Sequence, residues 1–341
     1  MLTVKQQWGF TVAIAVMCSF PLLALSQVEG GVSAVPGAPA YGFSTFTIQQ
    51  GAAASPEGLL PSFEPVKSLQ PGKAGVENNI PEAVTQDQSP SSKTDWDKLV
   101  TRSAHNQDKQ IHGEVLRGYA QSQQARGDYY NSVKTLADAL TIAKQADDPF
   151  RIAASLGGMG NALLAAGKQS SAEKILLEAI DVAKQIDDHS LSARLYNNLG
   201  NYYAVQEQQV KALSAYQNSA SLLAKSTLPK ATQALEMAKA YANIARIHLY
   251  VGSHKRAMRA LAQAKTEIRS AAQNEEYTSV LIHLAKSYEQ IALTQASQMR
   301  NSLLAAHALL QQAAKRSRAT DDNRLLSYAL GNLGALYQIE G

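Results

Sequence analysis

The stretches AKQADDPF, residues 143–150, and AKQIDDHS, residues 183–190, are nearly the same sequence placed 40 residues apart. Downstream of each, Gly160 and Gly200 stand in register, again 40 residues apart. Self-similarity at a fixed period of this length is the signature of a repeat architecture. We therefore expect the chain from residue 94 onward to be built from stacked copies of one unit.

Each unit shares an inner pattern of large, small and turn residues. In the second unit the pattern runs Met159, Gly160, Leu163, Gly167, Ala172, Leu176 and Ala179, and the other units carry the first small residue at Ala120, Gly200 and Ala245. Small residues are needed where two helix backbones approach closely, and a glycine lets the chain reverse between them. The pattern predicts two antiparallel helices of about four turns in each unit.

This pattern resembles the tetratricopeptide repeat, and the resemblance covers about residues 107–341. The period of 40 exceeds the usual ~34 residues, so the units are of a longer variety. The resemblance implies an all-α, right-handed α-solenoid of antiparallel helix pairs with about five and a half repeats. Five extra residues before the fourth unit predict a loop over STLPKATQ, residues 226–233.

The last two units depart from the strict period. In the fifth, the small residues of the second helix come late, which predicts a loop or a helix extension over about 292–302. In the sixth, Leu333, Gly334 and Tyr337 match the first helix, and Gly341 takes the turn position. We expect the solenoid, residues 94–341, to be truncated after that first helix, because solenoids normally end in a polar cap. The alternative is a natural terminus in which this helix is itself the cap.

Two N-terminal segments precede the repeats. Residues 1–26 carry Lys5, an apolar stretch and Ala24-Leu25-Ser26, which predict a cleaved signal peptide and an exported, periplasmic or secreted protein. The alternative is an inner-membrane anchor over residues 8–25. Residues 27–93 are rich in Gly, Ala, Ser, Pro and Gln, without apolar periodicity, which predicts a disordered linker that acts as a spacer or, second, as a docking segment.

Composition and motifs exclude several functions. The single cysteine, Cys18, lies inside the predicted signal, so the mature chain has no thiol nucleophile, disulfide or cysteine metal site. A formal charge of +4 without a Lys/Arg block gives no indication of a nucleic-acid partner. GGMGN, residues 157–161, lacks a following Lys-Ser/Thr and indicates helix packing rather than a phosphate loop. Neither HExxH nor GxSxG is present, so we expect no metal, no cofactor and no catalytic residue in this chain.

The exported signal, the low-complexity linker, the 40-residue repeats and YALGNLGALYQIEG at 328–341 together resemble the front half of bacterial secreted proteins in which such repeats precede a CHAT domain, a caspase-like peptidase module. The resemblance implies that any Cys–His dyad lies in a C-terminal part beyond Gly341. This chain is then the recognition or regulatory part of a larger peptidase protein. The alternative is a free-standing envelope adaptor or assembly factor.

The residues expected to face the inner surface of the solenoid are rich in amides and cations. They are Arg117, Gln121, Asn161, Asn197, Asn198, Asn201, Lys239, Asn243, Arg246, His283, Lys286 and Asn332. Asn side chains can bond both the donors and the acceptors of a peptide backbone, and Lys or Arg can pair with a carboxylate. The sequence thus predicts a groove for a protein or peptide, with Asn161, Asn197, Asn198, Asn201, Lys239, Asn243, Arg246 and Lys286 as its binding residues.

A more specific resemblance concerns two of these asparagines. In tetratricopeptide domains that clamp a C-terminal carboxylate, one Asn follows the small residue and another precedes the next small residue by two, as Asn201 and Asn243 do here. The clamp lysine, three residues before the small position, is replaced by Gly157 and Asn197. The alternative is that these asparagines mainly bond neighbouring helices.

Overall fold

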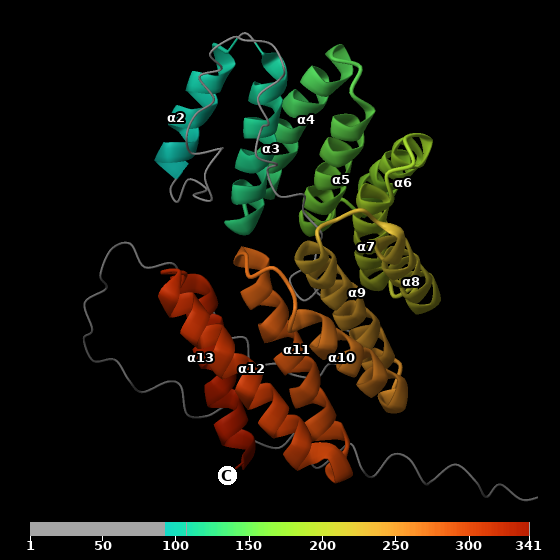
Figure 1. The fold of residues 1–341 in the computed structure, drawn as a ribbon, viewed down its shortest axis with the longest axis vertical. Coiled ribbons are helices and arrows are strands. Elements are labelled where there is room, and N and C mark those ends of the chain that lie inside the picture. The colour runs from blue at the N-terminus through green and yellow to red at the C-terminus, as the bar shows by residue number, and fades with distance from the viewer. Residues whose placement is uncertain (1–92, 107, 341) are drawn as a thin grey trace, which may run out of the picture. The chain divides into compact units, whose positions relative to one another are not determined.

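A computed structural model describes residues 93–106 and 108–340, which contain twelve α-helices, one short 3-10 helix and no strand. The bounds are α2 Lys93–Ala104, α3 Lys109–Ala125, α4 Tyr129–Gln145, α5 Pro149–Ala165, α6 Gln169–Gln185, α7 His189–Val205, α8 Gln209–Lys225, α9 Lys230–Tyr250, α10 His254–Ile268, α11 Glu275–Thr294, η2 Ala296–Gln298, α12 Met299–Ala319 and α13 Asn323–Glu340 (Figure 1).

The six helices α3 to α8 account for the period of 40. Each has 17 residues, and a connection of three residues leads to the next. Seventeen residues make about 4.7 turns at 3.6 residues per turn, slightly more than the four turns expected from the sequence. Two such helices with their connections give the observed period.

The repeated AKQxDD stretch ends one pair and starts the next. Asp147 and Asp187 have φ of 49° and 51°, the left-handed conformation that ends a helix. The following aspartates cap the next helix, because Asp148 Oδ1 accepts from the Arg151 amide and Asp188 Oδ1 from the Leu191 amide, both at 2.9 Å. The two stretches are nearly identical because each forms the C-terminal turn of one helix and the N-cap of the next.

Inside each pair the chain reverses at the predicted turn residue. Gly127, Gly167 and Gly252 have φ between 70° and 79°, and Glu207 takes the same conformation with φ of 55°. Glycine reaches this region without a Cβ penalty, which explains its use at three of the four positions. The sequence prediction of these turns is confirmed.

The small residues of the first helices meet large residues of the second helices. A Cβ added at Gly160 would lie 2.5 Å from Leu176 Cγ, and one added at Gly200 would lie 2.5 Å from Tyr216 Cε1. GGMGN lies within α5, where Gly157 faces Leu195 of α7 and Gly158 faces Leu136 of α4. Its interpretation as a helix-packing segment is confirmed.

The connection before the fourth pair is shorter than expected. Four residues, 226–229, separate α8 from α9, and residues 230–233 of the predicted loop form the first turn of α9 instead. Pro229 stands at the N-cap, where its missing amide costs nothing, and the Gln233 side chain donates to the Leu223 carbonyl of α8. The extra residues therefore lengthen a helix to 21 residues rather than a loop.

The fifth pair, α11 and α12, is joined through η2, which matches the predicted irregularity near 292–302. At the N-terminal side, α2 packs on α3 and precedes the first complete pair. The Trp96 ring stacks on Tyr119 with centroids 5.9 Å apart, and Tyr119 donates to Asp97 over 2.8 Å. The N-terminal turns of α2 therefore lie beside the C-terminal half of α3.

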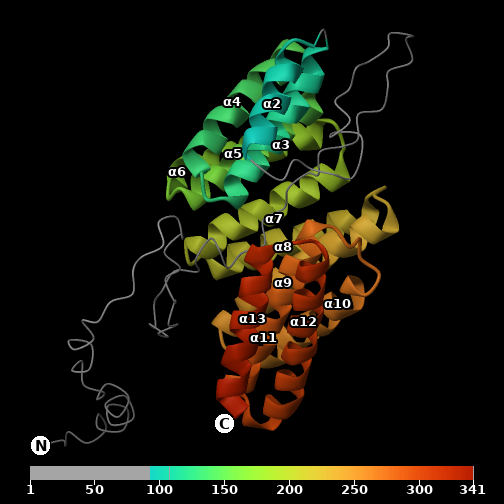
Figure 2. The same ribbon diagram turned by 90° about the vertical axis from the view of Figure 1, so that its left-hand side faces the viewer.

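The first helices of successive pairs also contact one another, from α3 through α5, α7, α9 and α11 to α13 (Figure 2). Their contacts and those within each pair form a continuous apolar core from Ala153 to Leu336. The chain is an all-α solenoid of antiparallel helix pairs, as the sequence predicts. No helix among the described residues is long and apolar enough to cross a membrane. The predicted signal, anchor and linker within 1–92, and Gly341, lie outside these residues.

Candidate peptide-binding face

The polar residues singled out in the sequence come from one row of neighbouring helices, α3, α5, α7, α9 and α11. We call the polar and charged side chains of this row the A face. Its members on α3, α7 and α9 are mostly buried: Arg117, Asn197, Asn198, Asn201, Lys239 and Asn243 are each at most 4% exposed. Three groups of interacting side chains lie on this face.

The first group is an asparagine cluster between α7, α8 and α9. Asn243 Nδ2 donates to Asn197 Oδ1 over 3.0 Å, and the Tyr216 hydroxyl donates to Asn201 Oδ1 over 2.9 Å. Asn243 also lies 3.5 Å from Asn201 Oδ1. Burial raises the pKa of Tyr216, so its hydroxyl stays protonated and donates. These bonds tie consecutive repeats together, as the alternative interpretation of the asparagines expects.

The second group is a chain of charges that runs from α7 across α9 to α11. Arg194 Nε lies 4.0 Å from Glu236, and Lys239 Nζ lies 3.3 Å from Glu236 and 3.1 Å from Glu276. Burial alone would lower the pKa of Lys239, but the two carboxylates outweigh it and raise that pKa. Burial raises the pKa of Glu276, against the opposing effect of Lys239. Lys239 is therefore a cation held between two carboxylates inside the stack.

The third group joins α3 to α5. Arg151 Nε donates to Glu114 Oε1 over 2.6 Å and also pairs with Asp148, whereas Arg117 lies 3.4 Å from Glu114. Burial would raise the pKa of Asp148, but its hydrogen bonds and ion pair with Arg151 prevail and lower it. Glu114 thus makes its short contact with Arg151 and its longer one with Arg117.

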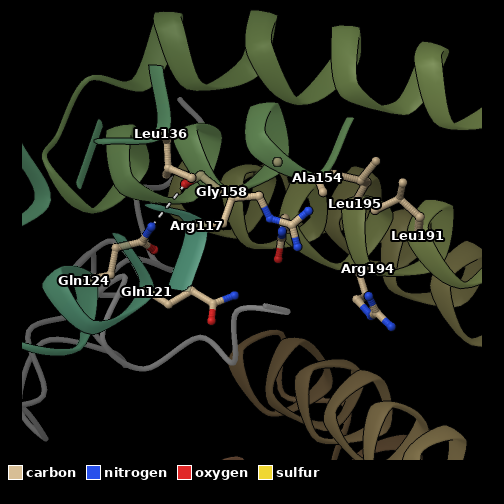
Figure 3. A pocket seen from close by; sticks show the side chains of 11 residues that line it. Arg117, Gln121, Gln124, Leu136, Ala154, Gly158, Leu191, Arg194 and Leu195 are labelled. Carbon is tan, nitrogen blue, oxygen red and sulfur yellow. Dashed lines mark hydrogen bonds between the residues drawn. The ribbon is translucent and has the colours of Figure 1, made fainter. Parts of the chain in front are cut away.

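A cavity of about 30 Å³ lies between the second and third groups. It is lined by Arg117, Gln121 and Gln124 of α3, by Leu136 of α4, by Ala154, Gly157 and Gly158 of α5, and by Leu191, Arg194, Leu195 and Asn198 of α7. Figure 3 shows both arginine side chains among these residues, and Gln124 Nε2 directed at the Gly158 carbonyl, 3.4 Å away. Arg117 and Arg194, from helices of different repeats, therefore line one small space together with amide and apolar residues.

Two of the residues that line the cavity on α5 are glycines. At Gly157 and Gly158 an added Cβ would meet Leu195 and Leu136, so neither position tolerates a larger residue without rearrangement. The volume is enough for one water molecule or the oxygen atoms of one carboxylate. The two arginines and three amide side chains among its lining residues can donate hydrogen bonds to a small anionic group.

The remaining predicted residues lie around these groups. Asn161 is buried on α5, one residue after Gly160. Arg246 on α9 is half-buried, and burial lowers its pKa against the opposing effect of Tyr216. Lys286 on α11 is exposed. The structure therefore brings Asn197, Asn201 and Asn243 into one cluster, places Lys239 in the charge chain, and leaves Lys286 at the surface of the same row of helices.

Sequence reasoning missed Arg194 and the carboxylates Glu114, Glu236 and Glu276. Arg194 and Lys239 each stand six residues before the small position of their repeat, at Gly200 and Ala245. Six residues turn the helix by about 600°, so this position lies about 120° around the helix from the small residue. Arg117 stands three residues before Ala120, and Gly157 and Asn197 stand at the corresponding positions of the two later repeats.

The described part of the chain contains no group of three His, Cys, Asp or Glu side chains arranged to hold a metal ion. The polar groups of the A face are amides, guanidiniums and paired carboxylates. Such groups bind and orient a ligand by hydrogen bonds and charge.

A family model described as tetratricopeptide repeat matches residues 113–185, which span α3 to α6. No match to a curated protein sequence was found. The match covers two helix pairs, which are therefore similar to tetratricopeptide repeats.

Several solved structures share the fold. BtubC from P. vanneervenii is 16% identical with a TM-score of 0.50, covering 67% of this chain and 91% of that one. Aspartyl phosphate phosphatase F from Bacillus subtilis is 14% identical with a TM-score of 0.51, covering 71% of this chain and 64% of that one. A signal transduction ATPase with a tetratricopeptide repeat sensor from Pyrococcus horikoshii is 16% identical with a TM-score of 0.50. The match covers 71% of this chain and 34% of that one. At these identities the likeness concerns the fold.

Proposed function

We propose that this chain is a protein–protein interaction scaffold that binds an extended peptide segment along the A face, with one carboxylate of the peptide held between Arg117 and Arg194. The observation that carries this function is the cavity of about 30 Å³, whose lining residues include Arg117, Arg194 and the glycines of α5. An arginine fork matches the planar geometry of a carboxylate, and the two helices supply one fork each.

Both arginines lie near carboxylates of the A face. Glu114 lies 2.6 Å from Arg151 and 3.4 Å from Arg117, and Glu236 lies 3.3 Å from Lys239 and 4.0 Å from Arg194. A ligand carboxylate at hydrogen-bond distance would add a charge-assisted contact with a guanidinium group.

The rest of the A face would bind the ligand backbone. Of the residues predicted from the sequence, we assign this role to Arg246, which is half-buried, and Lys286, which is exposed, because Asn161, Asn197, Asn198, Asn201, Lys239 and Asn243 are buried in the stack. Arg246 and Lys286 are the testable pair, because they lie on the adjacent first helices α9 and α11 of successive repeats. Replacing both with Ala should weaken peptide binding, and an unchanged affinity would remove this part of the assignment.

The proposed function extends to the protein in its cellular setting. On the sequence resemblance, the scaffold is exported and forms the recognition part of a larger protein with a CHAT peptidase domain, and the alternative is a free-standing envelope adaptor. The gene downstream of the Gly341 codon distinguishes the two. A continuation with one His and one Cys, each after an apolar strand-like run, supports the peptidase, and a stop codon supports the adaptor.

The binding experiment uses two pools of fluorescent dodecapeptides, random except for a fixed central Glu in one pool and Gln in the other. We expect the Glu pool to bind the full chain roughly 10- to 100-fold more tightly, because a hydrogen bond to a charged group contributes ~1.5–3 kcal/mol. Fluorescence anisotropy measures the affinity. Arg117→Gln with Arg194→Gln should abolish the difference between the pools, and equal binding of both pools to the unaltered chain would contradict the function.

The arginines are buried, so their replacement can also disturb the fold. Gln121→Glu avoids this problem, because Gln121 is half-buried at the cavity and the change adds a negative charge without removing an ion pair. It should weaken binding of the Glu pool while the melting temperature stays the same. Gln169→Glu on α6, at an exposed position, is the matched control and should leave binding unchanged.

A further inference from the structure

A second and larger cavity, which we call the N-terminal cavity, lies between α2, α3 and α4, three helices that are side by side in Figure 1. Its volume of about 530 Å³ is within the range of small-molecule sites, ~300–1,000 Å³. His112 lines it on α3 and is nine residues from Gln121, a rotation of about two and a half turns. The N-terminal cavity therefore lies on the opposite side of α3 from the A face and does not depend on the proposed function. Its apolar lining residues are Val100, Ala104, Leu116 and Ile142.

The polar residues that line the N-terminal cavity use their donor hydrogens within their own helices. The Thr101 hydroxyl donates to the Asp97 carbonyl over 2.8 Å, and the Thr141 hydroxyl donates to the Ala137 carbonyl over 2.9 Å. His105 Nδ1 lies 2.9 Å from the Thr101 carbonyl oxygen, which can only accept, so this nitrogen carries the hydrogen. In the neutral ring Nε2 is then an acceptor, and the two hydroxyl oxygens also have only lone pairs left.

The His112 ring is fixed in the same way. Ser103 Oγ donates to the Val100 carbonyl over 2.9 Å and lies 2.9 Å from His112 Nδ1, so Nδ1 donates to Ser103 and Nε2 is the acceptor. Burial and the charge of Lys109 lower the pKa of His112, against the opposing effect of Asp138, so the ring is neutral at pH 7. Asp138 also lines the cavity and adds a carboxylate, which only accepts. With both rings neutral, the five polar side chains of the cavity offer acceptors and no donor.

We propose that the N-terminal cavity binds a guanidinium group on an aliphatic stem, either an arginine side chain of a partner protein or a free alkylguanidine. A guanidinium group has five N–H donors and no acceptor, which matches a cavity whose polar side chains only accept. The apolar lining residues contact the stem. The C-terminal end of α2 also favours a cation, since the Lys109 ammonium donates there to the Ala104 carbonyl over 3.0 Å. A metal ion does not fit, because no three His, Cys, Asp or Glu side chains of the described residues are arranged to hold one.

The test compares 1-butylguanidinium with butylurea, its uncharged isostere, by isothermal titration calorimetry on the full chain at low salt. We expect 1-butylguanidinium to bind at least roughly tenfold more tightly, because its hydrogen bonds are charge-assisted. Asp138→Asn should weaken this binding at least roughly fivefold. Glu178→Gln, at the corresponding exposed position of α6 40 residues later, is the matched control and should leave it unchanged. Equal binding of the two probes, or an equal effect of the two variants, would overturn the proposal.

Two further measurements sharpen the assignment. Thr141→Val removes one acceptor at an exposed position without changing the charge, and should weaken 1-butylguanidinium binding roughly threefold while the melting temperature stays the same. Unchanged binding would show that the hydroxyl is not an acceptor for the ligand and would overturn the hydrogen-bond match.

Dodecapeptides with one central Arg, otherwise random, identify the source of the guanidinium group. Binding at least roughly tenfold tighter than that of 1-butylguanidinium, and weakened by Asp138→Asn, supports the arginine of a partner protein. Binding no tighter than that of 1-butylguanidinium supports a free alkylguanidine. If neither the peptides nor 1-butylguanidinium bind, the N-terminal cavity is not a guanidinium site.

Discussion

The pair α7/α8 and the helix α13 carry closely related sequences in different surroundings. LGNYY, residues 199–203, and LGALY, residues 333–337, both place a glycine after a leucine and a tyrosine three residues later. At Gly200 an added Cβ would lie within 2.9 Å of three atoms of the Tyr216 ring, whereas at Gly331 and Gly334 no described residue comes within 4 Å. The same motif is therefore a tight helix contact in one place and an open face in the other.

The partner helix, and not the helix that contains the glycine, therefore determines whether glycine is required at this position. In α7 the second helix of the pair supplies a fully buried Tyr216. In α13 the face with Gly331 and Gly334 also leaves Tyr328, Leu330 and Tyr337 between 42% and 56% exposed. The stability of the stack should accordingly be concentrated in the inner pairs, with α13 the weaker end.

The largest effect on the free energy of unfolding is expected for the buried charges of Lys239, Glu236 and Glu276. Lys239→Ala removes the cation between Glu236 and Glu276 and leaves two carboxylates close together, which should lower the free energy of unfolding by about 3–5 kcal/mol. Lys286→Ala, at an exposed position on α11, is the control and should change it by less than about 0.5 kcal/mol. Denaturant unfolding followed by circular dichroism measures both, and equal effects would show that Lys239 is not a structural cation.

The glycine contact gives the next largest effect. Gly200→Ala places a methyl group against the Tyr216 ring and should destabilise the protein by about 1–3 kcal/mol, despite the better helix propensity of alanine. Gly200→Ala combined with Tyr216→Leu should restore part of the loss, because the smaller side chain makes room. A double variant no more stable than either single variant would mean that the methyl group clashes with the backbone rather than with the ring.

How much of this could be predicted from the sequence depends on where the partner of each residue lies. Gly160 and Gly200, the turns at Gly127 and Gly167, and the caps at Asp148 and Asp188 repeat with the period, so their roles follow from one chain segment and its copy. The lengthening of α9 could not be predicted from the repeat pattern, because a proline such as Pro229 can stand at the start of a helix as well as in a loop.

The candidate site was harder to predict for the same reason. The A face was located from the register of the small residues, and the structure places the predicted asparagines on neighbouring helices of one row. The cavity between Arg117 and Arg194 depends on two helices that are not consecutive in the chain, with the glycines of α5 between them. The sequence identifies the two arginines but does not give the distance between α3 and α7, because that distance depends on how the helix pairs pack.

A smaller effect, with a defined pH dependence, is expected at the cap of α5. Asp148→Asn keeps an N-cap side chain but removes the ion pair with Arg151, and should cost about 1 kcal/mol at neutral pH. Because the pKa of Asp148 is lowered in the folded protein, its stabilisation is present above the ordinary value of 3.8 and is lost as the pH falls through the lower folded pKa. The difference between variant and parent should therefore shrink in acid, below about pH 4. A difference that is constant from pH 7 to pH 3 would contradict the ion-pair account.

The smallest change in stability is expected at α13, and there the substitution should stabilise the protein rather than destabilise it. Gly334→Ala adds a methyl group where no described residue lies within 4 Å, so it should cause no clash and raise the stability of α13 by up to about 1 kcal/mol through helix propensity alone. Hydrogen exchange of the α13 amides is the suitable measurement, because an end helix can open without unfolding the stack. The same substitution is expected to be destabilising at Gly200. The difference between the two variants therefore measures the cost of placing a methyl group against the second helix of a pair. If Gly334→Ala also lowers protection, then atoms outside the described residues cover this face in solution, because a methyl group costs stability only where it meets atoms.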